Sequence, residues 1–251
     1  GVQIPSGSSD FRRLDGGGRG RGLFMGGTQP GNTTINTINL IEVSTTGNAT
    51  DFGDLSDRPT QPTAFGDSTR GCVAGGNASP YASLISKIEY ITFSSSGGAN
   101  DFGELTEACR ALSNGCSDAT RGLRFGGVNS ATAFGNRIDF VTIATTGDAT
   151  EFGNLLLGRY GNPAVSNGVR GIQMAGNTGN NATNINIEFV NIQSKGDGQD
   201  FGQMITIVDD GGTCCDKTRG IAATSLSNVN TLEFITMATF GNAQDFGDLT
   251  S

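Results

Sequence analysis

The sequence predicts an all-β protein, a five-bladed β-propeller of four-stranded antiparallel blades. From Arg21 onward the dipeptide Arg-Gly occurs at five regularly spaced places, with successive spacings of 49, 51, 49 and 49 residues, and the tripeptide Asp/Glu-Phe-Gly follows each of them. A repeat period of roughly 40 to 50 residues is typical of propeller blades and other stacked units, because one such unit cannot bury its apolar face alone. Each repeat also contains four segments that can form strands, which completes the assignment.

The five repeats occupy nearly the whole chain of 251 residues, which indicates one domain. We expect an N-terminal arm over residues 1–10 and a single propeller over residues 11–251. The blades are expected at approximately 11–55, 56–105, 106–155, 156–205 and 206–251.

The first two predicted strands of a blade lie on either side of Arg-Gly. A weak strand precedes the dipeptide, as in residues 58–68 and 159–169. A short apolar run follows it and ends in a glycine pair, as in Cys72–Gly76. This run is too short for a helix, so we expect an inner strand whose backbone approaches a neighbour closely.

The third strand carries the strongest signal of the repeat. Its first, third, fourth and sixth places are apolar, and β-branched and aromatic residues dominate. Both sides of the strand are therefore apolar, as a strand between two neighbouring sheets requires. The five copies are residues 38–43, 88–93, 138–143, 187–192 and 232–237.

A glycine followed by Asn, Asp or Gly comes next in every repeat, as in Gly47-Asn48 and Gly147-Asp148. This pair predicts a two-residue hairpin turn, because such turns need positive φ. The fourth strand then holds Asp-Phe-Gly or its variant. We expect its Phe to pack against the adjacent blade and its Gly to let the chain bend.

One arginine and one acidic residue recur in step through the repeats. Partly buried charges must be compensated, so we expect each arginine to pair with an acid of its own or the adjacent blade. The other interpretation is a channel that grips an anionic ligand. The arginines are Arg21, Arg70, Arg121, Arg170 and Arg219, and the acids are Asp51, Asp101, Glu151, Asp200 and Asp245.

The formal charge of −8 argues against nucleic acid as a partner, and no apolar run is long enough to predict insertion into a membrane. Cys116 and Cys214 occupy the same place in the repeat, which Phe65 and Val165 fill elsewhere. We therefore expect small buried thiols there, with a disulfide as the alternative.

The residue types present favour a protein without catalytic activity. The chain has no histidine, which excludes a Ser-His-Asp triad and any histidine-held metal. We expect no catalytic residue, no metal site and no cofactor. Chemistry by a pair of carboxylates, as in glycoside hydrolases, stays open because 24 acidic residues are present.

Sugar binding by loops at the propeller rim is a further possibility. The chain lacks Trp, the usual stacking platform, and has three Tyr. Tyr81 and Tyr160 lie outside the main strands and are the candidate ligand contacts. The loops that vary between repeats, and so carry any specificity, are residues 28–36, 77–86, 128–137 and 177–184, with a shorter fifth loop at 226–230.

A glycine pair at the end of an apolar strand, followed by aromatic residues in the next two strands, resembles kelch-type propeller repeats. Phe stands here where kelch blades usually carry Trp, as at Phe152. The segments 121–127 and 138–155 are more specifically similar to kelch-like repeats of virion and tail structural proteins of marine tailed phages, cyanophages among them.

That resemblance implies a non-enzymatic virion protein, either a capsid-surface decoration or a tail-fibre module. Its partners would be other virion proteins and a host receptor or surface glycan. The alternative is a secreted, extracellular glycan-binding propeller lectin, and a carboxylate-based glycoside hydrolase is the third hypothesis.

Overall fold

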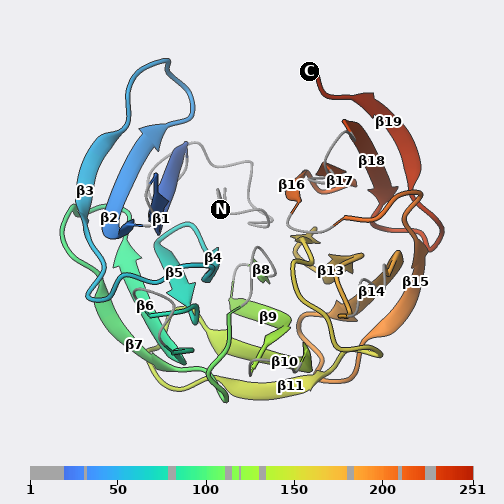
Figure 1. Ribbon diagram of the computed structural model, residues 1–251, viewed down its shortest axis with the longest axis horizontal. Coiled ribbons are helices and arrows are strands. Elements are labelled where there is room, and N and C mark those ends of the chain that lie inside the picture. Colours follow the sequence, from blue (N-terminus) through green and yellow to red (C-terminus); the bar gives the residue numbers. More distant parts are fainter. Residues whose placement is uncertain are drawn as a thin grey trace.

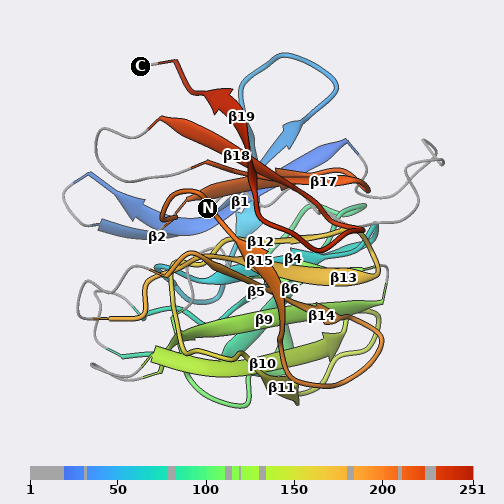
Figure 2. The same cartoon turned by 90° about the vertical axis from the view of Figure 1, so that its right-hand side faces the viewer.

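The computed structural model describes residues 20–30, 33–78, 83–110, 115–118, 120–129, 134–179, 184–208, 211–223 and 230–250. These residues form nineteen strands in five antiparallel sheets. The sheets stand around a common axis, as Figures 1 and 2 show, and the chain is a five-bladed β-propeller. No helix that could span a membrane occurs in these ranges.

Each blade follows the chain from the axis outward. Blade 1 is β1 (Arg21–Gln29), β2 (Thr33–Glu42) and β3 (Thr50–Asp54). Blade 2 is β4 (Thr63–Gly66), β5 (Arg70–Ala74), β6 (Lys87–Thr92) and β7 (Asn100–Glu104). Blade 3 is β8 (Gly115–Ser117), β9 (Arg121–Val128), β10 (Phe134–Thr142) and β11 (Thr150–Asn154). Blade 4 is β12 (Ala164–Ser166), β13 (Arg170–Met174), β14 (Asn186–Asn191) and β15 (Gln199–Gln203). Blade 5 is β16 (Gly212–Cys215), β17 (Arg219–Ala223), β18 (Thr231–Thr236) and β19 (Gln244–Asp248).

This order confirms the predicted sequence of strands, with the first strand near the axis and the last at the rim (Figure 1). Arg-Gly begins the second strand in blades 2 to 5 and β1, the first described strand, in blade 1. The predicted arm over residues 1–10 and the weak first strand of blade 1, in residues 11–18, lie outside the described residues.

The hydrophobic core lies between the blades. One cluster joins Leu23, Ile38 and Phe52 of blade 1 to Ile91 and Phe93 of blade 2, and similar clusters join blades 2 to 3, 3 to 4 and 4 to 5. The third strand supplies side chains to both of its faces: Ile88 and Ile91 are both buried. The prediction of a central strand with two apolar sides is therefore confirmed.

The predicted two-residue hairpin turns are wrong. Seven residues connect the third and fourth strands of each blade, for example between Thr92 and Asn100. The glycine in this connection does not close its own hairpin. Gly97 N–H instead donates to Phe52 O at 2.8 Å, and Ala99 N–H donates to Asp54 O at 2.8 Å, both on the rim strand of the preceding blade. The glycine signal therefore marks a contact between blades.

The same pair of bonds recurs at all four boundaries between consecutive blades, which we call joints. The second joint uses Gly147 and Ala149, the third Gly196 and Gly198, and the fourth Gly241 and Ala243, with donor–acceptor distances of 2.7 to 3.1 Å. The side-chain oxygen of Asp148, Asp197 or Asn242 adds a third bond to the rim strand in the last three joints, at 2.9 to 3.0 Å. Main-chain bonds thus fix the spacing of the blades.

The glycine of Asp-Phe-Gly makes this approach possible. Gly202 has φ +150°, and a Cβ there would meet the main chain of Gly241 in the next blade. Gly247 has the same place in blade 5 with φ +134°, but a Cβ there would meet nothing within 4 Å. The two positions therefore share the backbone conformation and differ in the contact.

We predict that Gly202→Ala destabilises the protein more than Gly247→Ala does. Both substitutions incur the cost of a side chain at positive φ, roughly 1–3 kcal/mol. Gly202→Ala adds overpacking in the fourth joint, roughly another 1–3 kcal/mol. Urea denaturation followed by circular dichroism measures both, and equal losses would show that the joint contact has no energetic weight.

Candidate functional site

The repeated arginines connect each blade to the next. Arg70, Arg121 and Arg170 donate from Nη1 to the main-chain oxygens of Ile143, Ile192 and Met237, at 2.8 to 2.9 Å, and Arg21 binds Phe93 O in the same way. The guanidinium also lies over an aromatic ring of its own blade in four repeats, at 4.6 to 5.2 Å from the ring centre. The rings belong to Tyr90, Phe140, Phe189 and Phe234.

The predicted partners of these arginines are wrong. All ten residues of the two sets are described, and no ion pair joins an arginine to one of the five acids. Asp51, Asp101, Glu151, Asp200 and Asp245 are all exposed. Successive side chains of a strand point to opposite faces, so the acid faces solvent because the Phe after it faces the core. Arg21 pairs with Glu42 instead, at 3.0 Å.

A different acid, one that the sequence analysis missed, forms the carboxylate contact between blades. It is the second residue of the predicted segments 88–93, 138–143, 187–192 and 232–237, and it is buried in blades 2 to 5. Glu89 accepts from Ser56 N–H at 3.0 Å, Glu188 from Leu156 N–H at 2.8 Å and Glu233 from Ile205 N–H at 2.7 Å. Asp139 accepts from the Thr106 hydroxyl at 2.6 Å. A charged residue in an otherwise apolar strand was the available signal.

Two buried arginines do not follow the repeat. Arg124 takes the place that Val73 and Ala222 have in other blades, and it pairs with Asp139 and with Glu107, the latter at 3.4 Å. Arg159 pairs with Glu188 and donates to Asn186 O at 2.9 Å and Ala175 O at 3.1 Å. Burial lowers the pKa of Arg159 to about 10, so it stays a cation at neutral pH.

These ion pairs lie at the second and third joints. Removing one partner of such a pair would leave the other charge buried and uncompensated, which is strongly destabilising. Around Arg159 the buried side chains of Asn162 and Gln173 keep oxygen or nitrogen atoms without a protein partner. Such atoms are places for bound water.

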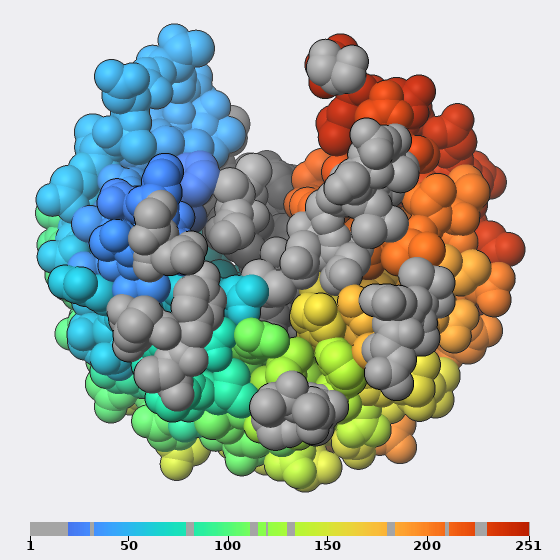
Figure 3. All heavy atoms as spheres, in the orientation of Figure 1, coloured from blue at the N-terminus to red at the C-terminus, as the bar shows by residue number. Residues whose placement is uncertain are grey.

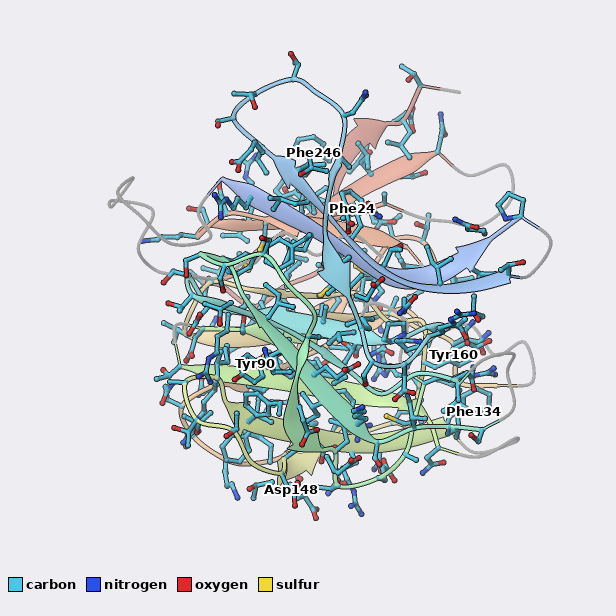
Figure 4. All side chains as sticks on the ribbon, turned by 90° about the vertical axis from the view of Figure 1, so that its left-hand side faces the viewer. Phe24, Tyr90, Phe134, Asp148, Tyr160 and Phe246 are labelled. Carbon is cyan, nitrogen blue, oxygen red and sulfur yellow. The ribbon has the colours of Figure 1, made fainter. Side chains whose placement is uncertain are left out.

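The candidate ligand contacts have different outcomes. Tyr81 lies outside the described residues. Tyr160 stacks on Phe134 of blade 3, with ring centres 5.2 Å apart and planes inclined by 20°. Figure 4 shows the two rings together at one side of the propeller. Tyr160 therefore packs between two blades, and one face of its ring is occupied by protein.

Shallow hollows lie beside the connections between third and fourth strands. In blade 3 the hollow has a volume of about 340 Å³, and Phe140, Thr142, Thr145, Asp148 and Thr150 contribute to its lining. Blade 5 has a similar hollow of about 430 Å³ that includes Phe234 and Phe240. Hydroxyl groups beside an aromatic ring are the kind of surface that binds polar ligands with apolar faces.

The five cysteines are all free thiols. Cys72, Cys109 and Cys116 are buried, whereas Cys214 is exposed. The prediction of a small buried thiol is therefore confirmed for Cys116 and wrong for Cys214. Cys214 lies on the innermost strand of the last blade, which has a neighbouring blade on one side only.

No family model matches the chain, and no curated protein matches it. Within the described residues no group of three or more Cys, Asp or Glu side chains could hold a metal ion. The fold and its contacts therefore carry the functional argument.

We predict that Glu188→Ala destabilises the protein by about 3–5 kcal/mol, because it leaves Arg159 buried without a counter-charge. Asp200→Ala removes an exposed acid of the same blade and should change stability by less than about 0.5 kcal/mol. Glu188→Gln is the matched control, since it keeps an acceptor for Leu156 N–H. Chemical denaturation compares the three, and a larger loss for Asp200→Ala would restore the original assignment of the acids.

We also predict that iodoacetamide at pH 8 modifies Cys214 first and spares Cys72, Cys109 and Cys116 until the protein unfolds. Burial raises the pKa of Cys72 to about 12 and raises those of Cys109 and Cys116. A thiol whose pKa is higher in the folded state makes its full contribution to stability below its unfolded pKa near 9. This contribution is lost as the pH rises from about 9 to 12. Stability should fall in that window, and less so in Cys72→Ala. Early labelling of Cys116 would contradict the assignment.

Proposed function

We propose that this chain is a non-enzymatic structural module of a phage particle, at the capsid surface or in a tail fibre. It acts by protein–protein contact with other virion proteins and by attachment to a host receptor. The observation that supports a structural role is that the repeated polar groups bind neighbouring blades. The repeated arginines bind main-chain carbonyls of the next blade, and the buried acids bind main-chain or hydroxyl groups of the preceding one.

The strand order supplies a surface on which such a module binds partners. The second strand of every blade ends, and the third begins, at the same edge of its sheet, so the connections between them all start and finish on one face of the propeller. Their sequences differ from repeat to repeat, whereas the joints repeat closely. A rigid scaffold that presents variable loops is the usual arrangement for recognition. The virion setting itself is supported by the resemblance of the repeats to phage virion proteins.

A glycan-binding lectin is the second candidate, and the hollow of blade 3 favours it. Four threonines and Asp148 line this hollow together with Phe140. Arg121 and Lys195 also lie over this ring, at 4.8 and 5.0 Å from its centre, which adds positive charge for an acidic sugar. This function would use the rim of the propeller rather than the loop face.

Mass spectrometry of purified phage particles tests the proposed function. We expect the chain at a fixed copy number per particle, resistant to removal by salt washing. A chain found free in the lysate and absent from washed particles would contradict the virion role. A glycan array with the purified protein separates the second candidate: saturable binding that Asp148→Ala abolishes would favour the lectin, with the exposed Asp200→Ala as the control.

A further inference from the structure

The four joints define what a fifth joint would require. A rim strand contributes a buried Phe and, three residues later, a buried Leu or Met, and its blade contributes the Arg-Gly arginine. The next blade contributes an apolar residue after its third strand, a glycine whose N–H binds the rim strand, and a second N–H two residues later. Both halves of one more joint are present in the chain.

Blade 5 carries the first half and blade 1 carries the second half. On blade 5 the residues are Phe246, Leu249 and Arg219, and on blade 1 they are Val43, Gly47 and Ala49. Gly247 has nothing within 4 Å of an added Cβ, whereas its counterpart Gly202 faces the main chain of the next blade, and no main-chain bond joins Gly47 N–H to Phe246 O. Among the described residues these two halves are therefore not in contact at the glycines.

The exposed fractions of the apolar side chains also distinguish these two halves from the four formed joints. Phe246 is 48 % exposed, whereas Phe52, Phe102, Phe152 and Phe201 are at most 5 % exposed. Leu249 is 45 % exposed, against at most 5 % for Leu55, Leu105, Leu155 and Met204. Val43 is 52 % exposed, against at most 2 % for Phe93, Ile143, Ile192 and Met237. Two apolar surfaces that are covered at every other boundary are open at this one.

The two surfaces border one notch in the ring. Figure 3 shows the notch at the top of the molecule, between the blue blade 1 and the red blade 5. The connection from β2 to β3 projects on one side of it and β19 on the other (Figure 1). Figure 4, seen from the side of blades 1 and 2, also places Phe246 at this end of the molecule.

We propose that this notch binds one further blade of the same repeat, as a sixth sheet around the axis. Such a blade presents a glycine-containing connection and an apolar strand end to blade 5, and an Asp-Phe-Gly rim strand and an arginine to blade 1. It therefore completes both open halves at once, with the contacts that the four joints already use. Asn48 of blade 1 would bind the rim strand of the added blade, as Asp148, Asp197 and Asn242 do in their joints.

The geometry of the joints argues against two alternatives, which are direct closure of the ring and the docking of a whole second copy. Direct closure of blade 1 on blade 5 would change the angle at four boundaries that are fixed by main-chain bonds and close packing. A whole second copy docked through its blade 1 would continue around the same axis. Its later blades would then meet blade 1 of the first copy. A single blade avoids both problems.

A six-repeat chain tests the proposal. Ser251 has the place in the repeat that Asp57 has, so a second copy of residues 58–107 joined after Ser251 keeps the register. We expect its melting temperature to rise by roughly 5 °C or more above that of the five-repeat chain. A chain extended with a scrambled version of the same residues is the control. No gain over this control would overturn the proposal.

Two exposed residues provide a sharper comparison. Phe246 also packs against Phe234 of its own blade, with ring centres 6.0 Å apart, so Phe246→Asp costs some stability in both chains. Phe246→Asp and Val43→Asp should nevertheless lower the melting temperature of the six-repeat chain by several degrees more than that of the five-repeat chain. Equal effects in both chains would overturn the proposal. So would self-association of the five-repeat chain that Phe246→Asp abolishes, measured by light scattering, since a second copy would then be the occupant.

Closure by the chain itself gives a different signature. In a Cys214→Ser background, Asn48→Cys and Asp248→Cys place one thiol on each open half. A disulfide that forms readily within one five-repeat chain would show that blade 1 reaches blade 5, and it would overturn the proposal. Failure of that bond to form, together with stabilisation by the sixth repeat, is the result expected.

Discussion

Each blade of this propeller depends on its neighbours because its central strand is apolar on both faces. Ile88 and Ile91 lie on opposite sides of β6, and each is buried against a different blade. A sheet of this kind exposes too much apolar surface to be stable alone, and each added neighbour covers one face. The spacing between sheets is then fixed by two main-chain bonds from the connection between the third and fourth strands of one blade to the rim strand of the preceding blade. Packing provides the driving force, and these bonds provide the geometry.

The charged groups at the joints also fix the relative position of the blades, through hydrogen bonds to buried carboxylates and from arginines. A buried carboxylate such as Glu233 accepts two main-chain N–H groups of the preceding blade, at 2.7 Å each, so its charge is compensated by hydrogen bonds. A repeated arginine such as Arg170 donates to the carbonyl that directly follows the next blade's third strand, while its guanidinium covers an aromatic ring. Because burying such groups without partners is unfavourable, they favour one relative position of the blades over others.

The fold could be predicted from the sequence because its signals are local and repeated. The period gives the blades, and the apolar pattern of residues 88–93 and its counterparts gives the central strand. The contacts between blades could not be predicted in the same way. Gly97 was assigned to a hairpin because glycine before a small residue is usually a local signal, whereas its partner is Phe52, 45 residues away. Arg170 and Asp200 each recur with the same repeat period. That shared period does not show that the two side chains are in contact. Cys214 was assigned by analogy with Cys116, which ignored the position of its blade at the edge of the notch.

Hydrogen–deuterium exchange of the joint amides tests the central claim most directly. The N–H groups of Gly97, Gly147, Gly196 and Gly241 bind the preceding blade, and that of Gly47 has no such partner among the described residues. The account predicts slow exchange at the first four positions and exchange at Gly47 that is faster by orders of magnitude. Protection of Gly47 equal to that of the other four would contradict it, because the ring would then be closed by its own five blades.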